Sequence, residues 1–131
     1  MDTPQNAVSL RIFTSMSDRW GLHPLYEAIV ERAREMHLAG ATVVRGPLGF
    51  GYSRRLRKGR LLALSENLPV VIEIVDTEEN INQFLPVLDG MMESGLVTIQ
   101  KAQVLRYSRQ RRSFARRVKE HFSRGDGTTA V

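Results

Sequence analysis

The stretch LPVVIEIV, residues 68–75, decides the fold, because β-branched residues dominate it and such residues favour strands. Alternate side chains of a strand point to opposite faces of the sheet. Here both sets are mostly apolar, with Val70, Ile72 and Ile74 on one face and Val71, Glu73 and Val75 on the other. A second copy of the chain would cover the second apolar face, so we expect a homo-oligomer. Alternatively, β propensity alone accounts for the valines.

The segments on either side of this stretch predict three more strands and two helices. Residues 8–14 alternate apolar and polar side chains as a half-buried strand does, and residues 41–45 form another short strand. Residues 15–23 are expected to be a loop. Amphipathic helices are predicted from residue 24 to about residue 39 and from residue 77 to about residue 94, with a last strand following. The order βαββαβ predicts an α+β, ferredoxin-like sandwich, with a four-stranded antiparallel sheet and two helices on one face.

Residues with known helix-terminal preferences predict where these helices begin and end. Gly40 is suited to follow the end of the first helix, and Gly95 to follow the second. Asp76 or Thr77 is expected to cap the start of the second helix. Pro86 lies inside that helix and removes a backbone hydrogen bond, so we expect a kink or an early stop there.

Length and composition are those of one soluble globular domain. The chain has 131 residues, of which 42% are hydrophobic and 25% charged, and it has no cysteine. These values exclude collagenous, coiled-coil and wholly disordered chains, disulfide frameworks and thiolate metal sites. The first residues do not have the pattern of a signal peptide, and no apolar stretch is long enough to span a membrane. We therefore expect a cytoplasmic protein.

The net charge of +5 is concentrated in two short segments. Residues 1–105 hold 11 basic and 12 acidic side chains, whereas residues 106–131 hold 8 basic and 2 acidic ones. A second basic segment lies within the first part, and it consists of Arg54, Arg55, Arg57, Lys58 and Arg60. Such a segment is suited to bind a phosphate, an acidic partner or nucleic acid, although most charged runs in loops are merely solvated.

The basic C-terminal segment has a helical spacing of apolar residues, with Phe114, Val118 and Phe122 at every fourth position. A basic amphipathic helix of this kind binds anionic membrane surfaces, nucleic acid backbones or acidic partners. The alternatives are a helix that docks on its own domain and a disordered extension.

The sequence contains no recognisable catalytic or metal-binding motif, so we do not predict an enzyme. The glycines at positions 46, 49 and 51 follow a strand and either approach a phosphate closely or simply bend the chain as it leaves the sheet. His23, His37 and His121 do not have the spacing of metal ligands. On the second face of the sheet, Glu73 is expected to form a salt bridge with Arg11.

Several blocks of sequence between residues 8 and 107 occur in a characteristic order. They are residues 17–20 (SDRW), 24–33 (PLYEAIVERA), 40–46 (GATVVRG), 49–51 (GFG), 68–76 (LPVVIEIVD) and 95–98 (GLVT). Together they resemble a family catalogued as domain of unknown function 190, which is grouped with the PII-like signalling proteins. The resemblance implies a PII-like domain over residues 1–107, followed by a basic tail over residues 108–131.

The resemblance also implies a non-catalytic regulatory protein that assembles as a homotrimer with the sheets facing its centre. A flexible loop, from about residue 46 to residue 67, would present the basic segment to a partner protein, and membrane transporters are among the candidates. PII-like proteins bind a small effector, most often an adenine nucleotide, between subunits at the base of this loop. The matching residues here are Arg45, Gly46, Gly49, Phe50, Gly51 and Asp76. The turn 75–80 departs from the family pattern, because it has three acids and neither glycine nor lysine, which disfavours a triphosphate.

Overall fold

The computed structural model of the chain describes residues 3–51, 56–58 and 67–106. Asn6–Gln103 form one compact unit. The terminal segments Met1–Gln5 and Val104–Val131 form a second unit, most of which lies outside the described residues. The helices and the candidate sites all belong to the first unit.

The first unit is built on a four-stranded sheet with the strand order β4-β7-β1-β8. Its strands are β1 (Gln5–Ser15), β4 (Thr42–Arg45), β7 (Pro69–Asp76) and β8 (Leu96–Val104). β7 runs antiparallel to both its neighbours, so that Val8 lies opposite Asp76 at one end and Arg45 lies opposite Val70 at the other. This order confirms the ferredoxin-like sandwich predicted from the sequence.

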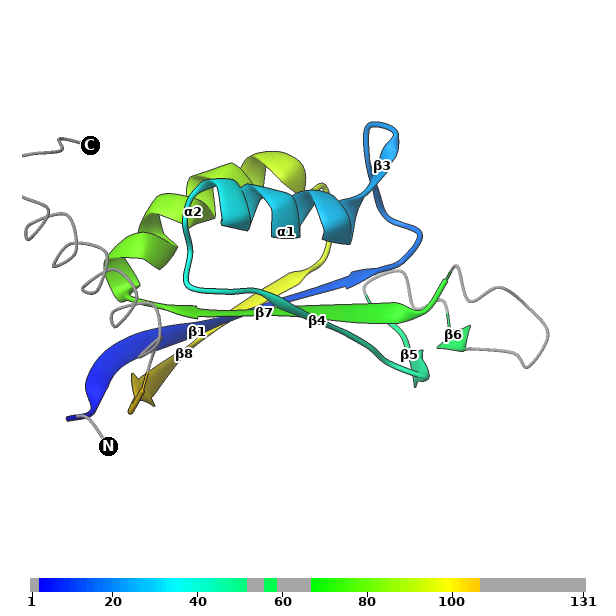
Figure 1. Cartoon of the computed structure of the whole chain (residues 1–131). Coiled ribbons are helices and arrows are strands. Elements are labelled where there is room, and N and C mark those ends of the chain that lie inside the picture. Colours follow the sequence, from blue (N-terminus) through cyan, green and yellow to red (C-terminus); the bar gives the residue numbers. More distant parts are fainter. Residues whose placement is uncertain (1–2, 52–55, 59–66, 107–131) are drawn as a thin grey trace, which may run out of the picture. The chain divides into compact units, whose positions relative to one another are not determined.

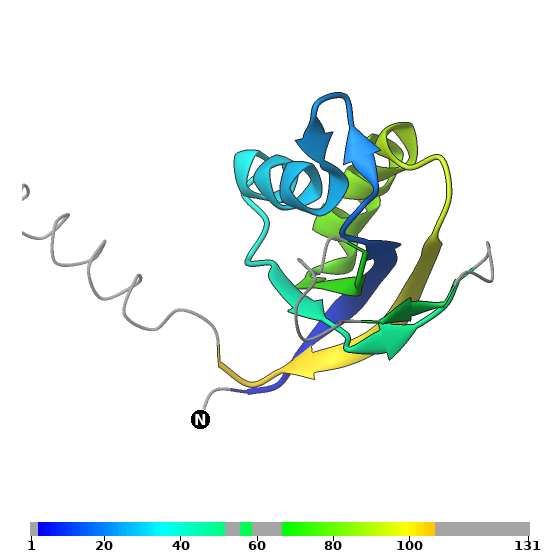
Figure 2. The same ribbon diagram turned by 90° about the vertical axis from the view of Figure 1, so that its right-hand side faces the viewer.

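Helices α1 (Leu25–Glu35) and α2 (Glu78–Met91) both cover one face of this sheet (Figures 1 and 2). The core lies between the helices and the sheet, where burial of each large apolar side chain contributes about 1.5–3 kcal/mol. Its fully buried members come from both layers and include Leu10, Ile12, Ile72, Ile74, Ile29, Ile81 and Phe84.

The first helix ends earlier than Gly40, so the prediction for its C-terminus is wrong. His37 takes the left-handed conformation, with a φ of 61°, and Met36 is the last half-helical residue. The Leu38 N–H then donates to the Ala33 carbonyl oxygen at 3.0 Å, as in a Schellman motif. A histidine is tolerated at this position because the motif satisfies the last carbonyl groups of the helix.

The second helix begins where expected and does not stop at its proline. Thr77 is the N-cap, and its side chain accepts a hydrogen bond from the Asn80 N–H at 3.2 Å. α2 continues through Pro86 to Met91, so the predicted early stop is wrong. Phe84, before the proline, is fully buried, and packing of this kind holds the helix in place despite the lost hydrogen bond.

Gly95 lies in the turn that joins α2 to β8, rather than at the end of the helix as predicted. Its φ is +129°, a conformation that other residues rarely adopt. A Cβ atom at this position would lie 2.9 Å from the carbonyl oxygen of Phe13. The close approach of two backbone segments therefore requires glycine here.

Two small ribbons occur where the sequence predicted only loops. β2 (Arg19–Trp20) pairs with β3 (His23–Pro24) and forms a hairpin just before α1. β5 (Leu48–Gly49) pairs with β6 (Arg57–Lys58) inside the predicted loop 46–67. Strands of two residues are too short to show a periodic pattern in the sequence.

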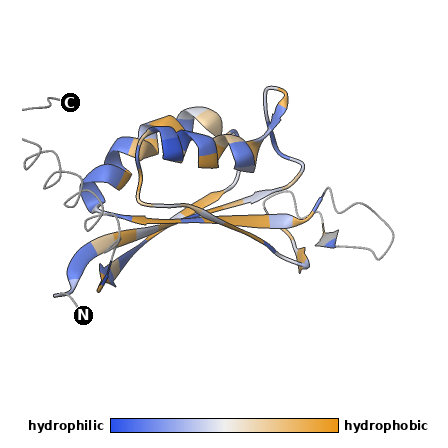
Figure 3. Ribbon diagram, in the orientation of Figure 1, coloured by the Kyte–Doolittle hydropathy of each residue, from blue (hydrophilic) through white to orange (hydrophobic). Residues whose placement is uncertain are grey.

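The sheet face that points away from the helices carries an apolar row across three strands. Val71 of β7 lies opposite Phe13 on one side and Val44 on the other, so the three side chains share this face. Phe13 is 37% exposed and Val44 is 56% exposed. Figure 3 shows the hydrophobic segments along these strands. The row is the second apolar face that the sequence predicted, and in one chain it is left partly open.

Candidate functional site at the loop base and on the open sheet face

Five of the six expected ligand residues lie together where β4 leaves the sheet. The Gly46 N–H donates to the carbonyl oxygen of Pro69 at 2.8 Å, which ties this segment to the start of β7. A Cβ atom added at Gly46 or Gly49 would lie 3.1 or 3.2 Å from the Pro69 Cγ atom. Both glycines therefore have a structural role, because they allow the chain to pass close to the proline ring. Nothing lies within 4 Å of a Cβ built at Gly51, and Phe50 is 68% exposed.

The β5–β6 ribbon brings part of the basic segment next to these glycines. Leu48 is paired with Lys58, and Gly49 with Arg57. Lys58 is exposed. The loop base thus combines glycine backbone, an exposed aromatic ring and at least one cation. Cations and backbone N–H groups contact the phosphates of a nucleotide, and an aromatic ring stacks on its base. Arg54, Arg55 and Arg60 lie outside the described residues.

A polar cluster lies at the other end of the predicted loop, next to Asn67. The Asp18 carboxylate accepts hydrogen bonds from the Thr14 hydroxyl and from the Ser15 N–H, the latter at 3.0 Å. The hydroxyl groups of Ser15 and Ser17 are 2.7 Å apart, and the Ser17 hydroxyl donates to the Asn67 side-chain oxygen at 2.9 Å. From the sequence, Asp18 is expected to cap or pair in the loop after the first strand, and it does so, whereas the contacts of Ser15, Ser17 and Asn67 were not predicted. A Thr-Ser-x-Ser-Asp run is typical of turns that hydrogen-bond their own backbone.

Backbone hydrogen bonds connect the same segment to the sheet and to the first helix. The Met16 N–H donates to the Leu68 carbonyl oxygen at 2.9 Å, and the Leu25 N–H donates to the Asp18 carbonyl oxygen at 2.8 Å. Together with the bond between Gly46 and Pro69, these contacts hold both ends of the predicted loop at the same end of β7.

Asp76, the sixth expected ligand residue, lies at the opposite end of β7 from the others. It lies six positions along β7 from Val70, the partner of Arg45, which corresponds to about 20 Å along a strand. Within one chain the structure therefore does not bring Asp76 to the loop base, because Asp76 is the last residue of β7 and the loop base adjoins the first.

Within one chain the Asp76 carboxylate accepts hydrogen bonds from the segments that surround it. It is 9% exposed, and its Oδ2 atom accepts from the Ala39 N–H at 2.8 Å. Its Oδ1 atom accepts from the Thr77 N–H at 2.6 Å and from the Asn80 side-chain amide at 2.9 Å. These bonds join the segment after α1 to the start of α2.

The open sheet face carries the ion pair that the sequence predicted. The Arg11 Nε atom lies 2.7 Å from the Glu73 Oε2 atom, on strands where the two residues are directly opposite. Their side chains are 48% and 42% exposed, so in one chain the pair contributes less than about 1 kcal/mol. The pair lies beside the apolar row formed by Phe13, Val71 and Val44, and its two charges neutralise each other within the chain.

Metal ligands do not cluster in the part of the chain that the structure describes. Within residues 3–51, 56–58 and 67–106, no group of three or more His, Asp or Glu side chains could hold a metal ion. His23 lies in β3 and His37 follows α1, while His121 is outside the described residues. Among the helices of these same ranges, none is long and apolar enough to cross a membrane.

Comparison with solved structures identifies the class of fold as PII-like. One similar structure is a PII-like signalling protein from Thermus thermophilus, with a TM-score of 0.60, 18% identity, and coverage of 80% of this chain and 94% of that one. Another is CPII, a nitrogen regulatory PII-like protein from Thiomonas intermedia K12 bound to ADP, AMP and bicarbonate. Its TM-score is 0.57, its identity 19%, and the match covers 81% of this chain and 94% of that one.

The chain itself belongs to the family of domain of unknown function 190, described as "Uncharacterized ACR, COG1993", whose model matches residues 7–104. A UPF0166 protein of Aquifex aeolicus is 43% identical over 73% of this chain and 90% of its own length. The UPF0166 protein MJ1524 of Methanocaldococcus jannaschii is 36% identical over 72% of this chain and 88% of its own length. The resemblance noted in the sequence is thus confirmed.

Proposed function

We propose that the protein is a non-catalytic PII-like regulator that forms a homotrimer through its open sheet faces. In this proposal a small effector, an adenine nucleotide, binds between subunits at the loop base and the basic loop contacts a partner protein. The observation that carries the proposal is the apolar row formed by Phe13, Val71 and Val44. Apolar side chains on three adjacent strands stay partly exposed to water in a monomer, which is unfavourable. Their burial under a second subunit would stabilise the assembly.

The trimer is tested by light scattering on the purified full chain. The expected mass is three times the 14.9 kDa of one chain. Replacing both Phe13 and Val44 with aspartate is expected to lower the mass to that of the monomer, because charges would then be buried between subunits. The matched control is Leu22→Asp, which changes an exposed apolar residue outside the sheet and should leave the mass unchanged. A monomeric parent protein would overturn the proposal of a trimer.

The nucleotide is proposed because CPII, which shares the fold, was solved with ADP and AMP. The loop base here supplies compatible groups, namely the exposed ring of Phe50 and the exposed cation of Lys58. AMP, ADP, ATP and cyclic nucleotides are tested by thermal shift, because binding to the native state raises the melting temperature. Replacing Phe50 with alanine is expected to remove the shift, and no stabilisation by any nucleotide at millimolar concentration would contradict this part of the proposal.

Binding of nucleic acid or of an anionic membrane through residues 108–131 stays a prediction, since that segment lies outside the described residues. It is distinguished by electrophoretic shift and liposome flotation with the full chain and with a variant that ends at Tyr107. Binding that falls steeply with salt and disappears in the shorter variant would favour this second function over the regulatory one.

A further inference from the structure

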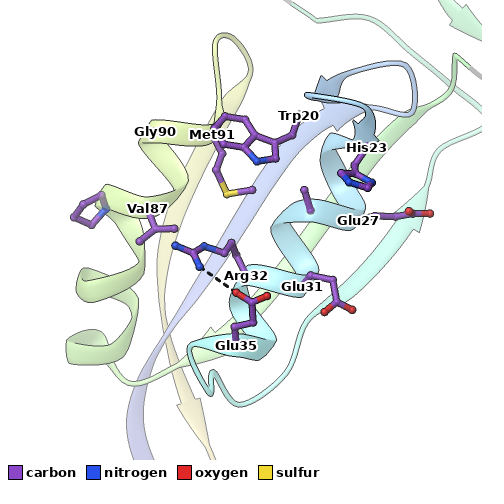
Figure 4. A pocket seen from close by; sticks show the side chains of 11 residues that line it. Trp20, His23, Glu27, Glu31, Arg32, Glu35, Val87, Gly90 and Met91 are labelled. Atoms are coloured by element: carbon purple, nitrogen blue, oxygen red, sulfur yellow. Dashed lines mark hydrogen bonds and ion pairs between the residues drawn. The ribbon is translucent and has the colours of Figure 1, made fainter.

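A groove of about 690 Å³ lies between the two helices, on the layer that faces away from the open sheet face (Figure 4). Its lining along α2 is apolar or small, with Pro86, Val87, Gly90 and Met91. Ala28 lines it from α1. The groove belongs to a single chain and is separate from the loop base, so what binds there does not depend on the proposed trimer or nucleotide.

Glycine at position 90 keeps the groove open. A Cβ atom built on Gly90 would meet nothing within 4 Å, so the space beside this turn of the helix is empty. Glycine within a helix is unfavourable by about 1 kcal/mol relative to alanine, as a general rule. Neither packing nor a left-handed conformation requires glycine here, in contrast to Gly95.

The hairpin formed by β2 and β3 closes one end of the groove with exposed apolar side chains. Trp20 and His23 line the groove, and Figure 4 shows Trp20 beside Met91 of α2. Trp20 is 45% exposed, and Leu22, at the tip of the hairpin, is 94% exposed. Half-exposed tryptophan next to an apolar groove is typical of residues that contribute most of the free energy at protein interfaces.

The rim of the groove is acidic. Glu27, Glu31 and Glu35 of α1 line it at successive turns, and the single cation of the lining, Arg32, is paired with Glu35 at 3.0 Å. Arg34, outside the lining, lies 3.6 Å from Glu31 in an exposed pair, so the three acids exceed the two cations of this helix by one charge. α2 adds to the negative charge of this layer, because its charged residues are all acidic: Glu78, Glu79 and Asp89. An anionic surface of this kind repels nucleic acid backbones and acidic lipids, and attracts cationic segments.

We propose that this groove is a docking site for a basic amphipathic peptide segment of a partner protein. An apolar side chain of the partner fills the space beside Gly90 and contacts Trp20, while its flanking Lys or Arg side chains lie against Glu27 and Glu31. Apolar anchoring in a groove with cations on the rim is how amphipathic helices are commonly recognised. The charge of the rim sets which partners approach, and the apolar lining provides most of the affinity.

Trp20 provides a direct test, because it is the single tryptophan of the chain. The probe is a synthetic helix-forming peptide with leucine at every third or fourth position, lysine and arginine elsewhere, and no aromatic residue. Binding in the groove removes water from the Trp20 ring, so its emission should shift to shorter wavelengths in a saturable way and return as salt is added. The control peptide carries glutamate in place of lysine and arginine, and it should produce no shift.

Matched variants of the full chain locate the binding. Gly90→Phe places a ring on the groove lining, at a position where an added Cβ atom meets nothing within 4 Å, and should weaken binding of the basic peptide at least about tenfold. Its control is Asn82→Phe, which places the same ring on an exposed position of α2 that does not line the groove and should leave binding unchanged. Reversing the charges of Glu27 and Glu31 to lysine should also weaken binding about tenfold, while Glu79→Lys should not.

Three results would overturn the proposal. The first is no change in Trp20 emission with the basic peptide at millimolar concentration. The second is equal binding of the acidic control peptide. The third is equal weakening by Asn82→Phe and Gly90→Phe while circular dichroism shows both variants folded. Weakening by Gly90→Phe and by the charge reversals, with both controls unaffected, would support it.

Discussion

Replacing Asp76 with alanine should destabilise the protein more than any single change of an exposed acid. The Asp76 carboxylate is 9% exposed and accepts three hydrogen bonds, two from backbone N–H groups and one from the side chain of Asn80. Alanine has no acceptor, so the hydrogen bonds that the Ala39 and Thr77 N–H groups donate to this carboxylate are lost in a mostly buried place. The junction between β7 and α2 and the segment after α1 would both loosen.

The size of the effect follows from these bonds. Hydrogen bonds to a charged group contribute about 1.5–3 kcal/mol each, but three bonds to one carboxylate are not additive. We expect Asp76→Ala to lower the free energy of unfolding by about 2–4 kcal/mol. Asp76→Asn retains one oxygen and should lose about half as much.

Urea denaturation at one fixed protein concentration measures these differences, because the proposed assembly would make stability concentration-dependent. Asp89→Ala, on an exposed position of α2, is the control and should change stability by less than about 0.5 kcal/mol. A loss below about 1 kcal/mol for Asp76→Ala would refute the structural role argued here. If Asp76→Asn kept full stability but removed nucleotide binding, the ligand role implied by the family resemblance would be correct instead.

Three other substitutions test the local structure, each by urea denaturation. Thr77→Ala removes the cap that accepts from the Asn80 N–H and should cost about 1 kcal/mol, while Thr77→Ser should restore most of it. Gly95→Ala should cost at least about 2 kcal/mol, because its φ is +129° and the new Cβ would lie 2.9 Å from the Phe13 carbonyl oxygen; a neutral result would contradict that geometry. Gly90→Ala should instead stabilise the protein by about 0.5–1 kcal/mol, because the helix position has open space; a loss of stability would show that the space is not empty.

The features that the sequence predicted correctly are those with a repeated local pattern. The alternation within residues 68–75 identified β7, and its two apolar faces correspond to the buried core and the open row. The pairing of Arg11 with Glu73 was predictable because both residues point to the second face of neighbouring strands. The cap at Thr77 was predictable from residue type alone.

The features that the sequence missed either have too short or too weak a local signal or depend on the pairing of distant segments. His37 ends α1 in place of Gly40 because the hydrogen bonds of the Schellman motif compensate for its left-handed conformation. The hairpin of β2 and β3 is too short for a periodic signal. The five expected ligand residues that follow β4 lie together because they are close in sequence, whereas Asp76 lies at the other end of β7 within one chain. Whether these residues bind a ligand between subunits stays a prediction.

In the proposed trimer, the ion pair between Arg11 and Glu73 affects which subunits can assemble with one another. Each chain neutralises this pair internally, so a neighbour that covers the open face does not need to supply a counter-charge. This ion pair therefore does little to discriminate between an identical subunit and a related one. In a cell that makes two such proteins, the choice between pure and mixed trimers would then depend mainly on how well the side chains at positions 13, 44 and 71 fit against one another.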